Sequence, residues 1–166
     1  MHDPNETIEE ALDVASLHCL RRTRSAVLNV LIGVALVVAG SGLLLRTRPA
    51  GARPDLASKL NQALLAALFV LFAFSTLLRR VLGRRARLDD PRSRWARFYW
   101  GHVLPALVGA LAAPLGLAHG WLVSPRVETI FPFWLTALLL GILAYPRGYE
   151  LEGYAAPMAW DEVPGR

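Results

Sequence analysis

The sequence predicts an all-α membrane protein with four transmembrane helices in a bundle, preceded by a short amphipathic helix. Three observations predict this class. Hydrophobic residues make up 54% of the chain, they concentrate in four long runs without Asp, Glu, Lys or Arg, and the basic residues gather between those runs. A soluble basic protein would instead spread its cations over a surface around a modest core. A length of 166 residues suits one domain.

The first segment, residues 1–24, begins with acidic residues and ends with basic ones. Thr7 with Glu10 fits a capping box, which marks the start of a helix. The apolar residues that follow recur on one helical face: Ile8, Ala11, Leu12 and Ala15. We expect a short helix lying on the membrane surface, with docking onto another subunit as the alternative. The acidic start argues against a cleaved signal peptide.

The first predicted span covers residues 25–45. These 21 residues carry no charge, and at about 1.5 Å per residue they extend roughly 31 Å, the thickness of a hydrocarbon core. Only Ser25, Asn29 and Ser41 are polar. A helix facing water would show polar residues every three or four positions, so we expect this helix to be surrounded by lipid and other helices.

Three further spans are predicted at residues 60–78, 100–123 and 129–146. The second run carries no charge and has three phenylalanines in its middle. The third contains Pro105 and Pro114, so we expect a kinked helix whose freed carbonyls are satisfied by neighbouring groups. The fourth is short, but aromatic residues stand at both of its ends, and such residues favour the two membrane interfaces.

Four spans would place both chain ends on one side of the membrane. That side comprises residues 1–24, the basic loop 79–97 and the tail 147–166, and it would carry 13 of the 18 basic residues. The positive-inside rule therefore predicts cytoplasmic termini flanking a transmembrane domain, residues 25–146. The third and fourth spans are expected to be antiparallel neighbours, and the first two to form the other hairpin. Of the 18 basic residues 17 are arginine, a bias typical of GC-rich coding that points to a bacterial cytoplasmic membrane.

The basic loop contains eight arginines: Arg79, Arg80, Arg84, Arg85, Arg87, Arg92, Arg94 and Arg97. Guanidinium groups bind phosphates bidentately, so we interpret these residues as a topology determinant that contacts lipid headgroups. The alternative is recognition of a cytosolic partner or an acidic lipid. Nucleic acid is not an expected partner, because no aromatic platform or groove-reading motif accompanies the charge.

Three histidines, His18, His102 and His119, are weak candidates for binding a cofactor. His102 and His119 are 17 residues apart, roughly 26 Å along a helix, so they cannot share one metal. His18 and His102 are both expected near the cytoplasmic interface and could approach each other. We predict no metal site, and the single cysteine excludes an internal disulfide.

A stripe of small residues runs along the third span at four-residue spacing: Ala112, Gly116 and Gly120. Small residues at this spacing let two helix backbones approach closely. We expect the stripe to pack against another helix of the same chain, with a contact between copies as the alternative.

The chain contains no recognisable catalytic or phosphate-binding motif. No Asp, Glu, Lys or Arg falls inside a predicted span, although proton- and cation-coupled pumps usually place an ionisable group there. We therefore expect a protein without catalytic residues or cofactors that binds the lipid bilayer and other membrane subunits, or itself, as an accessory or assembly subunit. A small oligomeric transporter or lipid translocator is the alternative. A redox protein with a histidine-ligated haem or metal is the second alternative.

Overall fold

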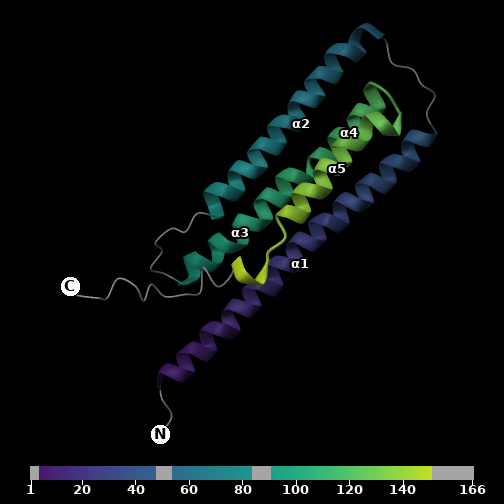
Figure 1. Ribbon diagram of the computed structural model, residues 1–166. Helices are drawn as coiled ribbons and strands as arrows, with labels where there is room; N and C mark the ends of the chain where they lie inside the picture. The colour runs from purple at the N-terminus through teal and green to yellow at the C-terminus, as the bar shows by residue number, and fades with distance from the viewer. Residues whose placement is uncertain (1–3, 48–53, 84–90, 151–166) are drawn as a thin grey trace, which may run out of the picture.

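The computed structural model describes residues 4–47, 54–83 and 91–150, with side chains for residues 14–47, 57–82 and 93–150. The described residues are helical apart from short connections and contain no β-strand, so the predicted all-α class is confirmed. They form five helices (Figure 1): α1 (Pro4–Arg46), α2 (Pro54–Gly83), α3 (Pro91–Ala110), α4 (Ala112–Leu122) and α5 (Val127–Leu143).

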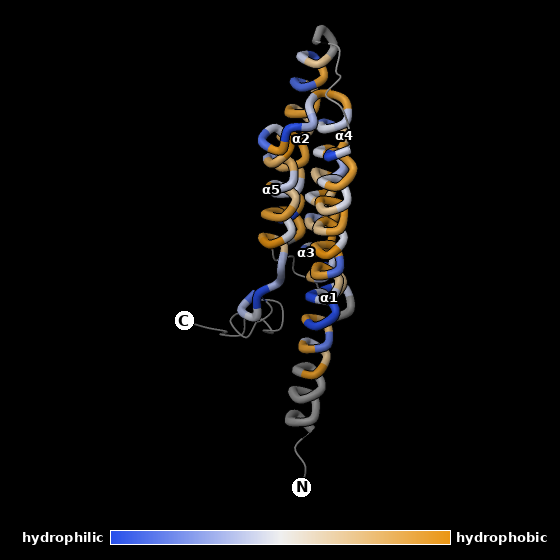
Figure 2. Tube along the Cα trace, turned by 90° about the vertical axis from the view of Figure 1, so that its right-hand side faces the viewer, coloured by the Kyte–Doolittle hydropathy of each residue, from blue (hydrophilic) through white to orange (hydrophobic). Residues whose placement is uncertain are grey.

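Three helical stretches are long and apolar enough to cross a membrane: Val14–Arg46 in α1, Ala57–Leu82 in α2, and Ser93–Leu122, which runs through α3 and α4. Hydrophobic residues dominate the middle of the bundle, and hydrophilic residues gather toward its ends (Figure 2). This composition is compatible with a membrane protein. The apolar helix α5 is shorter, with 17 residues, or about 25 Å, so a fourth crossing stays a prediction.

The helices run lengthwise in one bundle, with α3 and α4 at its centre (Figure 1). Both central helices contact α1, α2 and α5. The third and fourth apolar segments therefore pack as neighbours, as predicted. We expected the first two spans to pack against each other as a hairpin. This prediction is wrong, because α1 and α2 make no contact over the described residues. The third segment separates them, and α2 packs on it beside Gly101, where Leu82 is a neighbour.

The third apolar segment is broken at Leu111 into α3 and α4. We expected one kinked helix, and the difference has a local cause. Pro114 has no N–H, so it cannot bond to the carbonyl of Ala110 four residues earlier. The chain instead makes a tighter turn, in which the Leu111 N–H donates to the Val108 carbonyl at 3.2 Å. The break divides the central column into two straight helices.

The N-terminal segment is continuous with the first apolar run in α1, so a separate amphipathic helix is not confirmed. The helix begins at Pro4, and Thr7 lies inside it, so the predicted cap at Thr7 is wrong. Proline suits the first helical turn, where its missing N–H has no partner to lose. No glycine or proline follows until Gly33, and nothing ends the helix before the apolar run. The side chains of residues 1–13 lie outside the described set. The first turns of α1 extend past the other helices (Figure 1).

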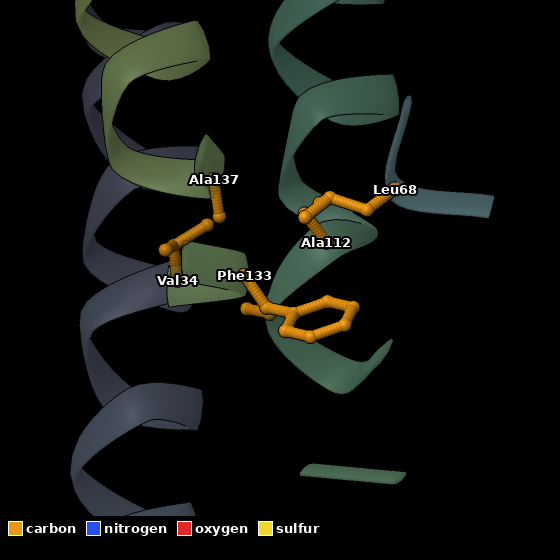
Figure 3. Close-up of a cluster of buried hydrophobic side chains, with 6 residues drawn as sticks. Val34, Leu68, Ala112, Phe133 and Ala137 are labelled. Atoms are coloured by element: carbon orange, nitrogen blue, oxygen red, sulfur yellow. The ribbon is translucent and has the colours of Figure 1, made fainter. Parts of the chain in front are cut away.

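The largest group of buried apolar side chains joins four helices near the middle of the bundle (Figure 3). Its members are Val34, Leu68, Ala112, Ala113, Phe133 and Ala137. Phe133 of α5 is fully buried and supplies most of the bulk, whereas the alanines of α4 and α5 leave room for its ring. Close packing of this kind holds apolar helices together in lipid, where burial from water provides no driving force.

This cluster generates a stability prediction. Phe133→Ala removes a ring that is 0% exposed, whereas the neighbouring Phe131 is 52% exposed and serves as the matched control. We expect Phe133→Ala to lower the free energy of unfolding by about 2 kcal/mol or more through the cavity that it leaves. Phe131→Ala should change it by less than about 0.5 kcal/mol. Unfolding in a mild detergent measures both, and equal effects of the two substitutions would contradict the packing described above.

Candidate functional site

Several arginine side chains of the bundle gather at one end, here called the basic end, where α2 ends, α3 begins and the chain returns after α5. Arg79 and Arg80 of the predicted loop lie in the last turns of α2, and Arg94 and Arg97 lie in α3. Arg84, Arg85 and Arg87 fall outside the described residues, as does the side chain of Arg92. Their contact with lipid headgroups stays a prediction.

Arg97 binds the carboxyl end of the neighbouring helix. Its Nε donates to the Leu82 carbonyl at 3.2 Å, and Nη2 donates to the Val81 carbonyl at 3.3 Å. The last carbonyls of a helix have no partner within it, and they carry the negative end of the helix dipole. This arginine therefore joins α2 to α3 within the chain, in addition to any role at the membrane surface.

Glu150, in the segment after α5, joins three parts of the basic end. Its Oε2 lies 2.8 Å from His102 Nε2 of α3, and its Oε1 accepts a hydrogen bond from Arg79 Nη2 of α2 at 3.2 Å. The backbone N–H of Arg147 also donates to Oε2, at 3.3 Å. The other ring nitrogen of His102, Nδ1, lies 3.1 Å from the Phe98 carbonyl oxygen. The His102 ring is 7% exposed, so this contact is largely shielded from solvent.

The surroundings of Glu150 change its acidity. Burial alone raises the pKa of the carboxyl, but hydrogen bonds from His102 and from the Arg147 backbone lower it, and the positive charges of His102 and Arg79 act in the same direction. The net result is a pKa below the ordinary value for glutamate. Glu150 is therefore held as a carboxylate at neutral pH.

Helix α1 also holds the segment after α5. Arg24 Nε donates to the Pro146 carbonyl at 3.4 Å, and its guanidinium lies 5.9 Å from the centre of the Tyr145 ring. Pro146 itself is fully buried. Side chains of α1, α2 and α3 therefore bind the segment 144–150. This segment lies beside α1 near the start of α3 (Figure 1).

A second polar contact lies toward the opposite end of the bundle. His119 Nε2 of α4 lies 2.9 Å from Asn61 Oδ1 of α2, and because that oxygen accepts, Nε2 carries the ring hydrogen. The His119 ring packs on Phe133 and is 2% exposed. Its Nδ1 and the indole Nε1 of Trp134 are buried without a hydrogen-bond partner among the described residues.

The three candidate histidines are not brought together. His18 is exposed on α1, His102 binds Glu150, and His119 binds Asn61. Within the described ranges no group of three or more His, Cys, Asp or Glu residues could hold a metal. The haem or metal alternative gains no support from this arrangement, since the Nε2 atoms of His102 and His119 already face protein side chains.

The small-residue stripe faces the interior of the bundle. Ala112 lies in the buried cluster of Figure 3, and Gly116 and Gly120 are buried. A Cβ added at Gly116 would lie 2.9 Å from Phe133 Cβ and 3.0 Å from the Trp134 indole. A Cβ added at Gly120 would lie 2.5 Å from the Leu45 side chain of α1. These contacts favour internal packing over a contact between copies as the role of the stripe.

Two contacts were not foreseen from the sequence, those of Glu150 and Asn61. Asn61 stands at the polar start of the second run, and Glu150 is the first acidic residue after the last run. Both residue types are ordinary at the ends of a span, so neither position carried a signal. The partners come from helices far apart in sequence, which only the tertiary structure can show.

Asn61→Ala tests the second polar contact. We expect it to lower the free energy of unfolding by about 0.5–2 kcal/mol, the range for interhelical hydrogen bonds in membrane proteins, because His119 Nε2 loses its acceptor. Gln62 is the matched control, since it is adjacent in sequence and exposed. Detergent unfolding that responds equally to Asn61→Ala and Gln62→Ala would argue against the contact.

Gly116→Leu tests the packing role of the stripe. We expect a loss of about 1–3 kcal/mol in unfolding free energy, because the larger side chain collides with Phe133 and Trp134. Gly33→Leu is the control, since a Cβ at Gly33 meets nothing within 4 Å. A Gly116→Leu protein that unfolds like the wild type but changes its oligomeric state would instead support a contact between copies.

The basic end therefore pairs arginine and histidine side chains with a carboxylate and holds the segment after α5 in place. The described residues hold no arrangement in which a nucleophile, its base and a substrate pocket meet. Comparison with protein-family models, with curated proteins and with solved structures finds no match to this chain.

Proposed function

We propose that the chain is a small integral protein of the bacterial cytoplasmic membrane that acts as an accessory or assembly subunit for other membrane proteins. In this proposal α1, α2, the α3–α4 column and α5 each cross the bilayer, and both termini are cytoplasmic. The packing of α5 along α3 and α4 supports a fourth crossing. The arginines at the basic end support the orientation, because that end would face the cytoplasm.

The observation that carries the proposal is the extension of α1 past the bundle (Figure 2). Val14 is 68% exposed and Leu17 is 46% exposed where this extension begins, ahead of the basic residues that would mark the membrane surface, whereas Ser16 between them is buried. Two apolar side chains about one helical turn apart would present one small apolar face to a partner. A neighbouring membrane protein could pack against this face without any chemistry in the chain itself.

A second candidate function, a small transporter or lipid translocator working as an oligomer, is favoured by a different feature. The central column is broken at Leu111, with Pro105 on one side and Pro114 on the other. Broken helices are common at the moving parts and substrate sites of transporters. This candidate ranks second because one side of the break is packed into the core, where Ala112 and Ala113 are fully buried, although Leu111 itself is exposed.

Purification of the tagged chain from its native membranes in mild detergent tests the leading function. We expect one membrane protein to co-purify in a fixed ratio, and a Val14→Ala/Leu17→Ala double variant to retain about tenfold less of it. The matched control is Leu28→Ala/Leu36→Ala, which truncates exposed apolar residues within the apolar run of α1. A chain that purifies alone, or a partner lost equally from both variants, would contradict the proposal. A pure homo-oligomer that moves a substrate across liposomes would favour the second candidate.

A further inference from the structure

The hydrogen bonds of His102 determine how many protons the basic end holds. Nδ1 faces the Phe98 carbonyl oxygen, which can only accept, so Nδ1 carries a hydrogen. Nε2 faces a carboxylate oxygen of Glu150, which also accepts when ionised. A neutral ring has one N–H, so neutral His102 beside ionised Glu150 would place two lone pairs against each other. The contact therefore requires one additional proton.

The groups around the pair determine where that proton lies. Arg79 from α2 donates to Glu150 Oε1, and the backbone N–H of Arg147 donates to Oε2. Donors to a carboxylate favour its ionised form, so the proton belongs on the ring. Arg24 from α1 faces the same segment through the Pro146 carbonyl. Of the other helices that contact α3, α5 has only Glu128 as a charged side chain, at its far end, and α4 has only His119 as a titratable one.

We infer that His102 and Glu150 form a proton-binding site, an imidazolium–carboxylate pair whose single exchangeable proton holds residues 147–150 on the bundle, beyond the buried Ala144 and Pro146. The site links α3, α2 and the segment after α5 through one carboxylate. When Nε2 loses its proton to water, the lone pair of Nε2 faces the Glu150 carboxylate oxygen. The attractive contact between His102 and Glu150 then becomes repulsive. The inference is independent of the accessory role, since it concerns the chain alone.

The sign of the pH dependence follows from the same contacts. The pKa of Glu150 is lowered in the folded protein, so its contribution to docking is present above the unfolded-state pKa and is lost as the pH falls through the lowered value. On the alkaline side the argument is geometric: without the Nε2 hydrogen two acceptors face each other, and docking is lost. The segment is therefore held at intermediate pH and released at both extremes.

The test follows the segment directly in the full-length chain. A nitroxide is attached at Gly148→Cys, where an added Cβ meets nothing within 4 Å, in a Cys19→Ser background. With the protein in liposomes, the nitroxide is immobilised while the segment is docked and mobile once the segment is released. We expect the ratio of docked to released protein to fall about tenfold per pH unit beyond each midpoint, as one proton per site requires. Nitrogen NMR of the His102 ring should show both nitrogens protonated while the segment is docked.

Glu150→Gln provides the sharpest contrast. Its amide N–H can donate to a neutral Nε2 while its carbonyl oxygen accepts from Arg79, at the loss of the Arg147 N–H contact to Oε2, so the segment should stay docked at alkaline pH, where the wild type releases it. Glu150→Ala should release the segment at every pH. Glu128→Gln, at the far end of α5, is the matched control and should keep the wild-type profile.

Three results would overturn the inference. The first is a neutral His102 ring while the segment is docked. The second is a wild-type segment that stays docked after the ring has become neutral. The third is alkaline release of Glu150→Gln at the same pH as the wild type. Each would mean that docking does not depend on a proton shared between His102 and Glu150.

Discussion

The apolar outer surface of the helices is the constraint on which the rest of the structure depends. Large side chains such as Leu36, Phe69 and Val70 are more than 60% exposed, on helices long enough to cross a bilayer. A soluble monomer rarely exposes apolar surface so continuously. In lipid, no water is present to satisfy a polar group, so backbone and side chains have to find partners within the chain. Ser41 and Thr76 accordingly donate back to carbonyls of their own helices.

Interhelical attraction has a different origin under this constraint. Lipid is as apolar as leucine, so helices associate through close packing and a small number of polar contacts. Glycines permit the close packing, for example at Gly109, where a Cβ would lie 2.5 Å from the Leu140 side chain. The polar contacts include His119 with Asn61 and Glu150 with His102 toward the two ends of the bundle, and the buried Ser75 hydroxyl, which donates to the Pro105 carbonyl between α2 and α3. Packing alone leaves apolar helices free to slide, whereas a directional hydrogen bond sets their register.

The order of apolar and charged residues predicted the helices well where an apolar run was long and uninterrupted. The charge-free run at 25–45 has no competing interpretation, because only a helix satisfies its own backbone bonds in lipid. The pattern was less informative at boundaries. The acidic start of the chain indicated a separate helix, yet without a glycine or proline before Gly33 it continues into α1. Pro105 and Pro114 predicted a kink, and the missing N–H of Pro114 divides the segment at Leu111, where a single tighter turn replaces the α-helical hydrogen bond.

By itself, therefore, the sequence determined the helical class, the apolar segments and the clustering of arginine, because these depend on local composition and on the period of a helix. The tertiary structure decided which helices are neighbours and which side chains meet. It placed the third segment between α1 and α2, directed Arg97 to the end of α2, and brought Glu150 to His102. Such pairings depend on contacts between residues 15 to 71 positions apart. Shape and hydrogen-bond geometry select those contacts, and no local pattern of residues encodes either.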